Sequence, residues 1–507
     1  MSGALLIAGT TSDAGKSVVT AGLCRWLSEQ GVRVAPFKAQ NMSLNSFVTL
    51  DGAEIGRAQA MQAAAARIEP EAQMNPVLLK PGSDRTSQVV VRGRVFAEVD
   101  AVGYRSQKET LLEIALESLA DLRSRYEVVI CEGAGSAAEI NLRSTDIANM
   151  GLAVAARLPT LIVGDIDRGG VFAGMFGTLA LLSSEDQALV AGFIVNKFRG
   201  APELLTSGLQ MLQDLTGRSV YGVLPFRAGL WLDVEDSLAM DVPRDTPTAP
   251  IGKDALRIAV VRFPRLSNVT DIDALAAEPG VIVRFASTPV DLMDADLVVL
   301  PGTRATVADL AWLRAQKLES IIKDRAKRGQ PVLGLCGGYQ MLGARIVDPV
   351  ESGYPEPVEA LGLLPVVTAF MVSKVLGRPT GKAVAFGGVP VSGYEIHHGR
   401  MMPYDGTPLF EREDGEAEGL LSGSVMGTVW HGALESDDFR RALLTWVAEL
   451  SGRDFTVGDV SFAAVREARL NSLGRLVADN LDTDAVWRLL DKGVPDGLPF
   501  VPPGAPA

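Results

Sequence analysis

Short apolar runs alternate with stretches of helical periodicity along most of this chain. The first run, residues 4–10, ends in a glycine-rich turn and leads into a helical pattern over residues 16–31, after which residues 32–38 form a second run. This order predicts a β-α-β unit and hence a parallel sheet. Further buried-type strands, separated by segments long enough for crossover helices, predict a doubly wound α/β domain. They are expected at residues 126–133, 158–167, 188–198 and 219–226.

A segment without periodicity divides the chain. Residues 241–256 are rich in Pro, Asp and Thr, as linkers are. The strand pattern then restarts, which predicts a second α/β domain. Its strands are expected at residues 256–263, 281–286, 295–303 and 330–338. The predicted organisation is a first domain over 1–240, a linker over 241–256, a second domain over 257–450, and a helical tail with a Pro- and Gly-rich end over 451–507.

Composition supports two domains and excludes several classes of function. The chain has 507 residues, whereas single cores stop growing at roughly 250–300 residues. Its 47% apolar and 21% charged residues are typical of a soluble globular protein. A net charge of −13 argues against nucleic-acid binding, and no apolar run approaches the roughly 20 residues that span a bilayer. We therefore expect a cytoplasmic protein with no membrane partner, and homo-oligomer formation stays open.

The turn after the first strand has the pattern of a phosphate-binding loop. The sequence GTTSDAGKS lies between a predicted strand and a predicted helix, where backbone N–H groups and the helix N-terminus form a cradle for anions. Five residues separate its two glycines, one more than usual, so the loop is a variant. Lys16 is expected to neutralise phosphate charge and Ser17 to hold Mg²⁺. The residues predicted to bind ATP here are Gly9, Thr10, Asp13, Gly15, Lys16 and Ser17.

Polar side chains at the ends of later strands complete the predicted ATP site. Glu132 ends one strand and Asp165 another. Since Mg²⁺ prefers oxygen ligands, the predicted metal ligands are Ser17, Glu132 and Asp165, with loop capping as the alternative role of the carboxylates. Asn196 and Lys197 close a further strand, where they are predicted to contact the adenine edge and face; a plain surface turn is the alternative.

A second reactive centre is predicted where Cys336 follows an apolar strand. In the sequence GLCGGYQ, the flanking glycines allow a nucleophile to sit on a strained strand-to-helix turn, as serine does in hydrolases. The following helix N-terminus stabilises a thiolate and supplies backbone N–H groups for an oxyanion hole, with Gly302 as a second donor. A cysteine nucleophile needs a base, and the chain has only three histidines. His431, directly after an apolar run near the end of the second domain, is the predicted base.

The remaining histidines and cysteines give weaker indications of chemistry. His397 and His398 are adjacent, so on a strand they face opposite ways; substrate binding by one of them and purely structural roles both stay open. Cys24 in the first predicted helix and Cys131 at a predicted strand end are expected in the core. Three scattered cysteines suit neither a disulfide framework nor a zinc site.

Several segments resemble known families. GLCGGYQMLG with a later histidine resembles class I glutamine amidotransferases, and GTTSDAGKS with CEGAG resembles ATPases of the dethiobiotin synthetase type. Further segments together resemble the cobyric acid synthase family of cobalamin biosynthesis, and the resemblance runs to about residue 445. They are FKAQNMSLNS, EIGRAQAMQA, MNPVLLKP, DIDRGGVFAG, NKFRG and GYEIHHGR. The resemblance implies an N-terminal P-loop NTPase-like domain and a C-terminal class I glutamine amidotransferase α/β domain.

This resemblance also implies a reaction, the amidation of the b, d, e and g carboxylates of adenosylcobyrinic acid a,c-diamide. L-Glutamine would be the nitrogen donor, and ATP with Mg²⁺ would be consumed for each amide. Cys336 and His431 match the nucleophile and the catalytic histidine of the family. The usual third member of the triad, a glutamate two residues after the histidine, is replaced by Ala433, and Glu435 is displaced from that position. Glu435 is therefore excluded, and whether any carboxylate completes a triad stays open.

Side chains in the same segments are expected to bind the substrates. The predicted substrate-binding residues are Lys38, Gln40, Asn41, Gly302 and Gln340. Lys80, Arg85 and Arg92 are further candidates for contacts to corrinoid carboxylates, with solvated surface charge as the alternative.

Two other functions remain in competition with this one. The first is the related synthase that amidates the a and c carboxylates of cobyrinic acid, which shares both domain types. The segments AQNMSLNS and EIGRAQ favour cobyric acid synthases over it. The second is a regulatory ATPase of the partitioning type, against which the Cys336 elbow and His431 argue.

Overall fold

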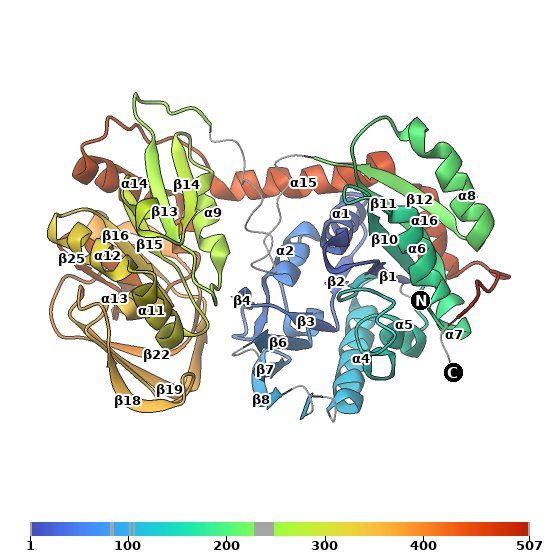
Figure 1. The fold of residues 1–507 in the computed structure, drawn as a ribbon, viewed down its shortest axis with the longest axis horizontal. Helices are drawn as coiled ribbons and strands as arrows, with labels where there is room; N and C mark the ends of the chain where they lie inside the picture. Colours follow the sequence, from blue (N-terminus) through green and yellow to red (C-terminus); the bar gives the residue numbers. More distant parts are fainter. Residues whose placement is uncertain (1–2, 82–85, 101–102, 105–106, 228–247, 505–507) are drawn as a thin grey trace. The chain divides into compact units, whose positions relative to one another are not determined.

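The chain forms two compact units, which are described separately (Figure 1). The computed structural model describes residues 3–81, 86–100, 103–104, 107–227 and 248–504. Arg85 and residues 241–247 of the expected linker lie outside the described residues. The first unit consists of Met1–Ser43, Ile55–Asp233 and Glu467–Ala507, and the second of Leu44–Glu54 and Val234–Arg466.

A six-stranded parallel sheet forms the centre of the first unit. Its strand order is β12-β11-β10-β1-β9-β2, and every neighbouring pair is parallel. Parallel neighbours need crossover connections, so the predicted doubly wound fold is confirmed. The strands are β1 (Gly3–Gly9), β2 (Val34–Phe37), β9 (Val128–Glu132), β10 (Thr160–Asp165), β11 (Val190–Phe198) and β12 (Ser219–Pro225).

Both faces of this sheet are buried. Along β1, Leu5 belongs to one core cluster and Leu6 to another, because successive side chains of a strand point to opposite faces. Cys24 and Cys131 lie in these cores, as predicted, and burial raises the pKa of both thiols, that of Cys131 to about 12. Burial thus disfavours the thiolate, the reactive form, in both residues. The helices are α1 (Lys16–Glu29), α2 (Arg57–Ala65), α4 (Lys108–Arg125), α5 (Met150–Ala156), α6 (Val171–Ala180), α7 (Ser184–Gln187) and α8 (Thr206–Thr216).

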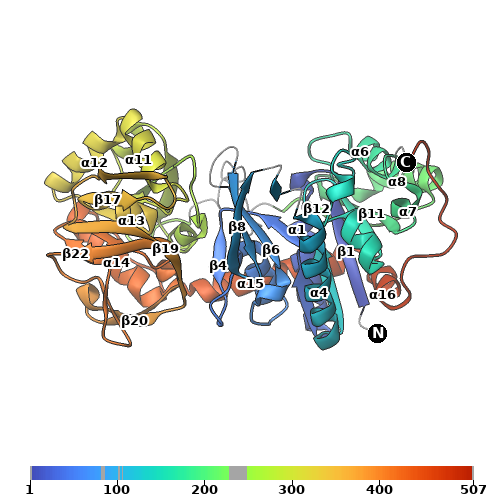
Figure 2. The ribbon, with the colours of Figure 1, turned by 90° about the horizontal axis from the view of Figure 1, so that it is seen from below.

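The chain between β2 and β9 adds a small four-stranded sheet that the sequence patterns did not predict (Figure 2). Its order is β3-β6-β7-β8, in which β3 is parallel to β6 and the other pairs are antiparallel. The strands are β3 (Gln40–Met42), β6 (Val77–Pro81), β7 (Thr86–Val91) and β8 (Arg94–Asp100). Three candidate substrate residues, Gln40, Asn41 and Lys80, therefore belong to this added sheet.

A second six-stranded sheet forms the centre of the second unit. Its order is β14-β13-β15-β16-β26-β25, parallel except for the antiparallel pair of β25 and β26. The four predicted strands appear as β13 to β16, which confirms the α/β class. The strands are β13 (Leu256–Val261), β14 (Val281–Ala286), β15 (Leu297–Leu300), β16 (Val332–Leu335), β25 (Leu420–Ser422) and β26 (Val425–Thr428). The helices are α9 (Asp273–Ala276), α10 (Pro289–Leu292), α11 (Thr306–Ala315), α12 (Leu318–Lys327), α13 (Gly337–Leu342) and α14 (Asp437–Ser451).

Two smaller sheets extend the second unit, in the orders β18-β17-β19-β22 and β21-β20-β23-β24. The first consists of β17 (Arg345–Asp348), β18 (Tyr354–Glu359), β19 (Val366–Gly377) and β22 (Glu395–Pro403). The second consists of β20 (Thr380–Ala383), β21 (Val389–Ser392), β23 (Phe410–Arg412) and β24 (Ala417–Glu418). Residues 44–54 also belong to the second unit, although they lie within the range expected for the first domain. They contain β4 (Ser46–Val48), which pairs with β5 (Glu54–Gly56).

The helical tail is divided between the units. It forms α15 (Phe462–Asn480) and α16 (Thr483–Lys492), and residues from Glu467 onward belong to the first unit. There, Leu473 and Val477 are fully buried, and a Cβ atom on Gly22 of α1 would lie 2.5 Å from the Val477 side chain. The tail therefore completes the core beside α1.

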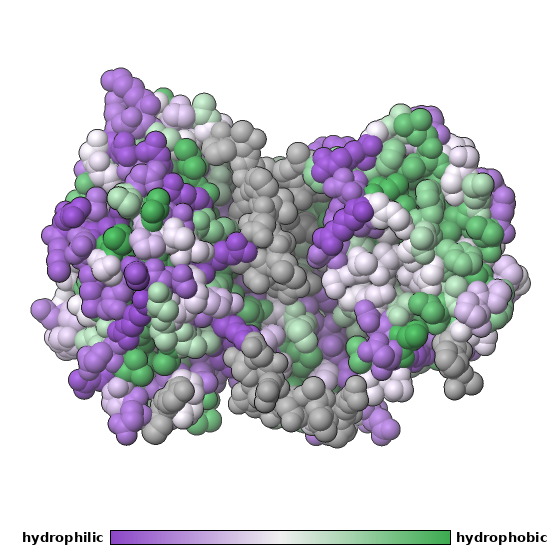
Figure 3. All heavy atoms as spheres, in the orientation of Figure 1, coloured by the Kyte–Doolittle hydropathy of each residue, from purple (hydrophilic) through white to green (hydrophobic). Residues whose placement is uncertain are grey.

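Apolar side chains are exposed on α8 of the first unit (Figure 3). Met211 and Leu215 are each 66% exposed. Exposed apolar patches are typical of protein contacts, and the homo-oligomer stays a prediction. Within the described part of the chain, no helix has the length and apolar character needed to cross a membrane.

Candidate active sites

The phosphate loop connects β1 to α1 with the geometry that its glycines allow. The turn Ser12–Ala14 follows β1, and Gly15 has a φ of 101° immediately before α1 begins at Lys16. A Cβ atom on Gly15 would lie 1.9 Å from Nδ2 of Asn196, so both the conformation and the space require glycine. Asn196 supports the loop by donating from Nδ2 to the Ala14 carbonyl at 2.9 Å.

Lys16 folds back over this loop. Its Nζ donates to the carbonyl oxygens of Thr11, Ser12 and Gly135 at 2.9, 3.0 and 2.9 Å, and the residue is 4% exposed. A Cβ atom on Gly9 would lie 3.1 Å from the same Nζ. The ammonium group is therefore held inside the loop, where an anion bound by the backbone N–H groups would meet it.

Glu132 is the centre of a buried polar cluster beside the loop. Ser17 Oγ donates to its carboxylate at 3.0 Å, Lys38 Nζ pairs with it at 2.8 Å, and Gln62 Nε2 also donates to it. Burial alone would raise the pKa of Glu132, but the charge and hydrogen bond of Lys38, with Lys16 and Gln62, hold it below its usual range. The carboxylate is therefore ionised and faces a hydroxyl oxygen, a donor set that fits Mg²⁺.

Asp165 is engaged by a lysine in the same region. Lys197 Nζ lies 2.8 Å from its carboxylate and donates to the Asp13 carbonyl at 2.9 Å. Among the residues that the structure describes, no group of three or more His, Cys, Asp and Glu side chains is arranged to hold a metal ion. Mg²⁺ commonly takes one or two protein ligands and completes its shell with phosphate oxygens and water, which fits Ser17 and Glu132.

The other candidates for corrinoid binding have different surroundings. Gln40 Oε1 accepts from Lys108 Nζ at 2.9 Å, and Asn41 Nδ2 donates to Gln59 at 2.9 Å. Arg92 pairs with Glu117 of α4 at 2.7 Å. Lys38 and Arg92 thus have different carboxylate partners, Glu132 and Glu117.

Cys336 occupies a strained turn between β16 and α13. Its φ is 48° and its ψ is −107°, a conformation that is rare for residues other than glycine. The turn is closely packed, since a Cβ atom on Gly337 would lie 2.6 Å from Thr303 and one on Gly338 would lie 1.9 Å from the Leu300 carbonyl. The flanking glycines thus permit the elbow that the sequence predicted.

His431 is held by a carboxylate that the sequence did not reveal. Its Nδ1 donates to Oδ2 of Asp271 at 2.6 Å, and the Gly432 N–H donates to Oδ1 of Asp271 at 2.8 Å. Burial alone would lower the pKa of His431, but the charge of Asp271, followed by that of Cys336, raises it to about 10. The arrangement is a cysteine, an imidazole and a buried carboxylate in series.

Asp271 was missed because it is remote from the histidine in sequence. It lies 160 residues before His431, in the turn Val269–Ile272, and no local pattern marks it. Glu435, nearer in sequence, pairs with Arg466 at 2.9 Å, and its exclusion from the catalytic set stays a prediction. The order of elements was an indirect indication. Asp271 follows β13, and Cys336 follows β16 of the same sheet, so both residues come after strands of one sheet.

Two of the predicted substrate-binding residues, Gly302 and Gln340, lie near the elbow. A Cβ atom on Gly302 would lie 2.9 Å from Cε1 of His431, so only glycine leaves room for the imidazole. Gln340, one turn after Cys336, is 2% exposed and accepts a hydrogen bond from Thr306 at 3.0 Å. Its amide nitrogen would lie 2.5 Å from a Cβ atom on Gly399.

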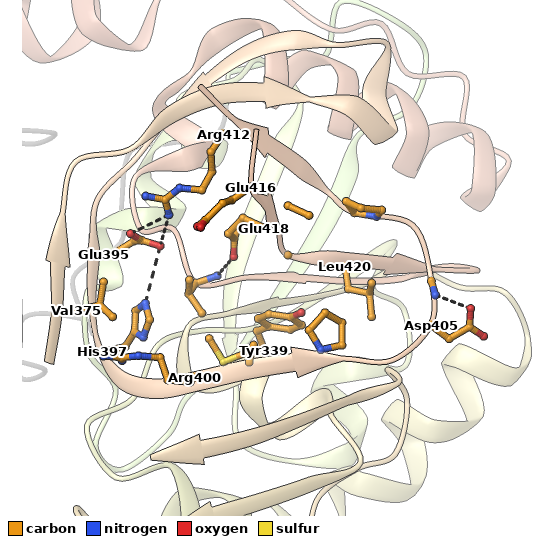
Figure 4. A pocket seen from close by; sticks show the side chains of 17 residues that line it. Tyr339, Val375, Glu395, His397, Arg400, Asp405, Arg412, Glu416, Glu418 and Leu420 are labelled. Carbon is orange, nitrogen blue, oxygen red and sulfur yellow. Dashed lines mark hydrogen bonds and ion pairs between the residues drawn. The ribbon is translucent and has the colours of Figure 1, made fainter. Parts of the chain in front are cut away.

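His397 faces a pocket of about 520 Å³ in the second unit (Figure 4). Its Nδ1 donates to the Gly399 carbonyl at 2.7 Å, and its Nε2 lies 4.0 Å from Glu395, which pairs with Arg412 at 3.1 Å. Neither Cys336 nor the catalytic histidine candidate is among the residues that line this pocket.

His398 has a separate environment on the same strand. Its Nδ1 donates to the Met371 carbonyl at 3.0 Å. Burial, followed by the charge of Lys374, lowers the pKa of His398 to about 4, so it is neutral at pH 7.

Both halves of the chain match known domain families. Residues 5–238 match the CobQ/CobB/MinD/ParA nucleotide binding domain family, and residues 257–439 match the CobB/CobQ-like glutamine amidotransferase domain family. The cobyric acid synthases of Frankia casuarinae and Streptomyces avermitilis are 60% and 61% identical to this chain, with 100% of both chains covered in each comparison. That of Mycolicibacterium paratuberculosis is 57% identical over 97% of each chain. The chain therefore belongs to the cobyric acid synthase family of ligases, in which a nucleotide-binding domain precedes a glutamine amidotransferase domain.

Proposed function

We propose that this protein converts the b, d, e and g carboxylates of adenosylcobyrinic acid a,c-diamide to amides, using L-glutamine and ATP with Mg²⁺. The observation that carries the proposal is the presence of two distinct reaction centres in one member of this family. One is the Cys336 elbow with the His431–Asp271 pair, and the other is the phosphate loop with Ser17 and Glu132. The first is suited to release of ammonia and the second to activation of an acid.

In the glutaminase half, the Cys336 thiolate attacks the carboxamide carbon of glutamine. Backbone N–H groups at the start of α13 stabilise the oxyanion, and the His431 imidazolium, held by Asp271, gives its proton to the departing ammonia. A thioester with Cys336 remains. The neutral imidazole then takes a proton from water, whose oxygen attacks the thioester and releases glutamate and the thiolate.

In the synthetase half, a corrinoid carboxylate attacks the γ-phosphorus of ATP and gives an acyl phosphate and ADP. Lys16 and the backbone of the loop stabilise charge on the transferred group, and Ser17 and Glu132 are the residues that would hold Mg²⁺. When bound, this ion neutralises phosphate charge and orients the transfer. Ammonia then attacks the acyl carbon, forms the amide and displaces inorganic phosphate.

The lysine of the FKAQN segment is better assigned to the metal site than to the corrinoid. Lys38 is 3% exposed, and its ammonium pairs with Glu132 at 2.8 Å. Removing a partner from such a buried pair leaves an uncompensated charge. We therefore assign Lys38 to holding Glu132 ionised and in place, and leave Gln40, Asn41 and Lys80 as the candidates for corrinoid contact.

Mass spectrometry of the product tests the function directly. The protein is incubated with ATP, Mg²⁺, glutamine and the a,c-diamide, and four successive conversions of a carboxyl to a carboxamide are expected. Cobyrinic acid is offered in parallel. Amidation of cobyrinic acid at a and c, with none on the a,c-diamide, would identify the related synthase instead, and ATP hydrolysis without glutamine hydrolysis would favour the partitioning-type ATPase.

Asp271→Asn is expected to lower glutaminase kcat by roughly 100-fold or more, because the amide cannot stabilise the imidazolium. Ammonium-dependent amidation should persist. The substitution removes the charge that raises the pKa of His431, so this pKa falls, and NMR titration should show an imidazole that stays protonated from pH 5 to 9 in the parent but titrates in the variant. Glu435→Gln is the matched control, and an equal loss of kcat there would contradict the role of Asp271.

A further inference from the structure

Residues 44–54 are held by the second unit, although the chain on both sides of them belongs to the first. Val48 packs in a buried cluster with Tyr394 and Ile396. At the other end of the segment, Glu54 and Lys374 form an ion pair in which their side chains are 1% and 9% exposed. We call residues 44–54 the strap.

The strap holds the turn that carries Asp271. The Ser46 N–H donates to Oδ1 of Asn268 at 2.9 Å, and the Val269 N–H donates to Oδ1 of Asn45 at 3.3 Å. Asn268 has a φ of 51° and begins the Val269–Ile272 turn. Two reciprocal side chain–backbone bonds, buried from water, thus fix the start of the turn whose third residue orients His431.

The strap also contacts the ring that stacks on the histidine. Phe47 lies 5.1 Å from the Tyr394 ring, and the Tyr394 ring is stacked on His431 at 5.4 Å with an interplanar angle of 28°. Tyr394 and His431 also exchange backbone hydrogen bonds at 2.8 and 2.9 Å. The strap therefore touches both supports of the imidazole, the carboxylate turn and the stacked tyrosine.

Both ends of the strap continue into residues that bind Glu132. Lys38 precedes the strap and Gln62, in α2, follows it, and both donate to the carboxylate that accepts from Ser17 of the phosphate loop. A nucleotide with Mg²⁺ that engages Ser17 and Glu132 changes the charge that Lys38 and Gln62 face. Residues 39–43 and 55–61 connect Lys38 and Gln62 covalently to the two ends of the strap.

We propose that the strap positions the Asp271–His431 pair for glutamine hydrolysis and transmits the state of the phosphate-loop site to it. The proposal rests on the function proposed above. Asn45, Asn268 and Phe47 act as positioning residues, since they contact the supports of the imidazole. The consequence for the enzyme is that ammonia is released in step with occupancy of the synthetase site.

Steady-state kinetics of Asn45→Ala and Phe47→Ala test the positioning role. We expect glutaminase kcat to fall roughly 10- to 100-fold, because a small misplacement of catalytic groups has effects of this size. The KM for glutamine and the ammonium-dependent amidation should stay within about twofold of the parent values. Leu50→Ala, in the same strap but 69% exposed, is the matched control and should match the parent.

Two results would overturn the positioning role. The first is a glutaminase kcat that is the same in both variants as in Leu50→Ala. The second is a loss of ammonium-dependent amidation as large as the loss of glutaminase kcat, which would mean that the strap serves the fold of the whole chain. A parent protein without glutaminase or amidation activity would instead refute the proposed function, so the two failures are distinguishable.

Hydrogen–deuterium exchange tests transmission. In the parent protein, ATP with Mg²⁺ is expected to change amide exchange in residues 44–54, and Lys16→Ala should abolish the change. Identical exchange of the strap with and without ATP and Mg²⁺ in the parent would refute the transmission.

Discussion

Replacing Cys336 by alanine is expected to lower glutamine-dependent amidation by roughly 10⁴-fold or more, since no other group can form the thioester. Amidation with added ammonium salts should continue near the parent rate, because the phosphate-loop site does not use this thiol. The measurement is amide formation on the a,c-diamide with each nitrogen source. Alanine suits the strained turn as well as cysteine does, since both carry a Cβ atom.

The control for this variant is Cys24→Ala, which removes a buried thiol that takes no part in the proposed chemistry. It should retain amidation with both nitrogen sources. Loss of ammonium-dependent amidation in Cys336→Ala, with Cys24→Ala active, would contradict a glutaminase that is separate from the synthetase. Glutamine hydrolysis that persisted in Cys336→Ala would exclude this cysteine as the nucleophile.

Lys16→Ala is expected to reduce amidation by roughly 100- to 1,000-fold with either nitrogen source, because the loop loses the positive charge that stabilises phosphoryl transfer. Glutamine hydrolysis measured without ATP should match that of the parent protein measured without ATP, since Lys16 takes no part in the Cys336 centre. The readouts are ADP release, amide formation and glutamate formation, measured on the same preparation.

Lys327→Ala is a suitable comparison, since this side chain is 77% exposed and pairs only at 3.8 Å with Asp324. It should match the parent in all three assays. Ammonium-dependent amidation at the parent rate in Lys16→Ala would remove the loop from the synthetase site.

The sequence predicted the features that short segments encode. The phosphate loop depends on Gly15 with Lys16 and Ser17, and the elbow depends on glycines on either side of Cys336, so a few consecutive residues specify each. The six strands of the first sheet and β13 to β16 of the second were also predictable, because their cores are buried on both faces and produce continuous apolar runs. The assignment of substrate and of individual site residues remains a prediction.

The features that sequence patterns missed depend on contacts between distant segments. Asp271 meets His431 across 160 residues, and nothing near either residue indicates the partner. Lys38 was predicted to contact the corrinoid substrate, and its burial against Glu132, which lies 94 residues away, could not be predicted from either segment. The strap was assigned to the first domain because it lies inside that range, whereas contact made it part of the second unit. Strands β3, β23 and β24 have three residues or fewer, too few for a periodic signal.

The tail places a constraint on how the protein is made. The first unit includes Glu467–Ala507, and Leu473, Val477 and Leu489 from that stretch are buried in its core. A nascent chain therefore cannot complete the core of the first unit until the C-terminal residues have been translated. A fragment cut near residue 240 lacks the tail residues that pack beside α1, so we expect separate expression of the two catalytic halves to require that the final helices be supplied to the first.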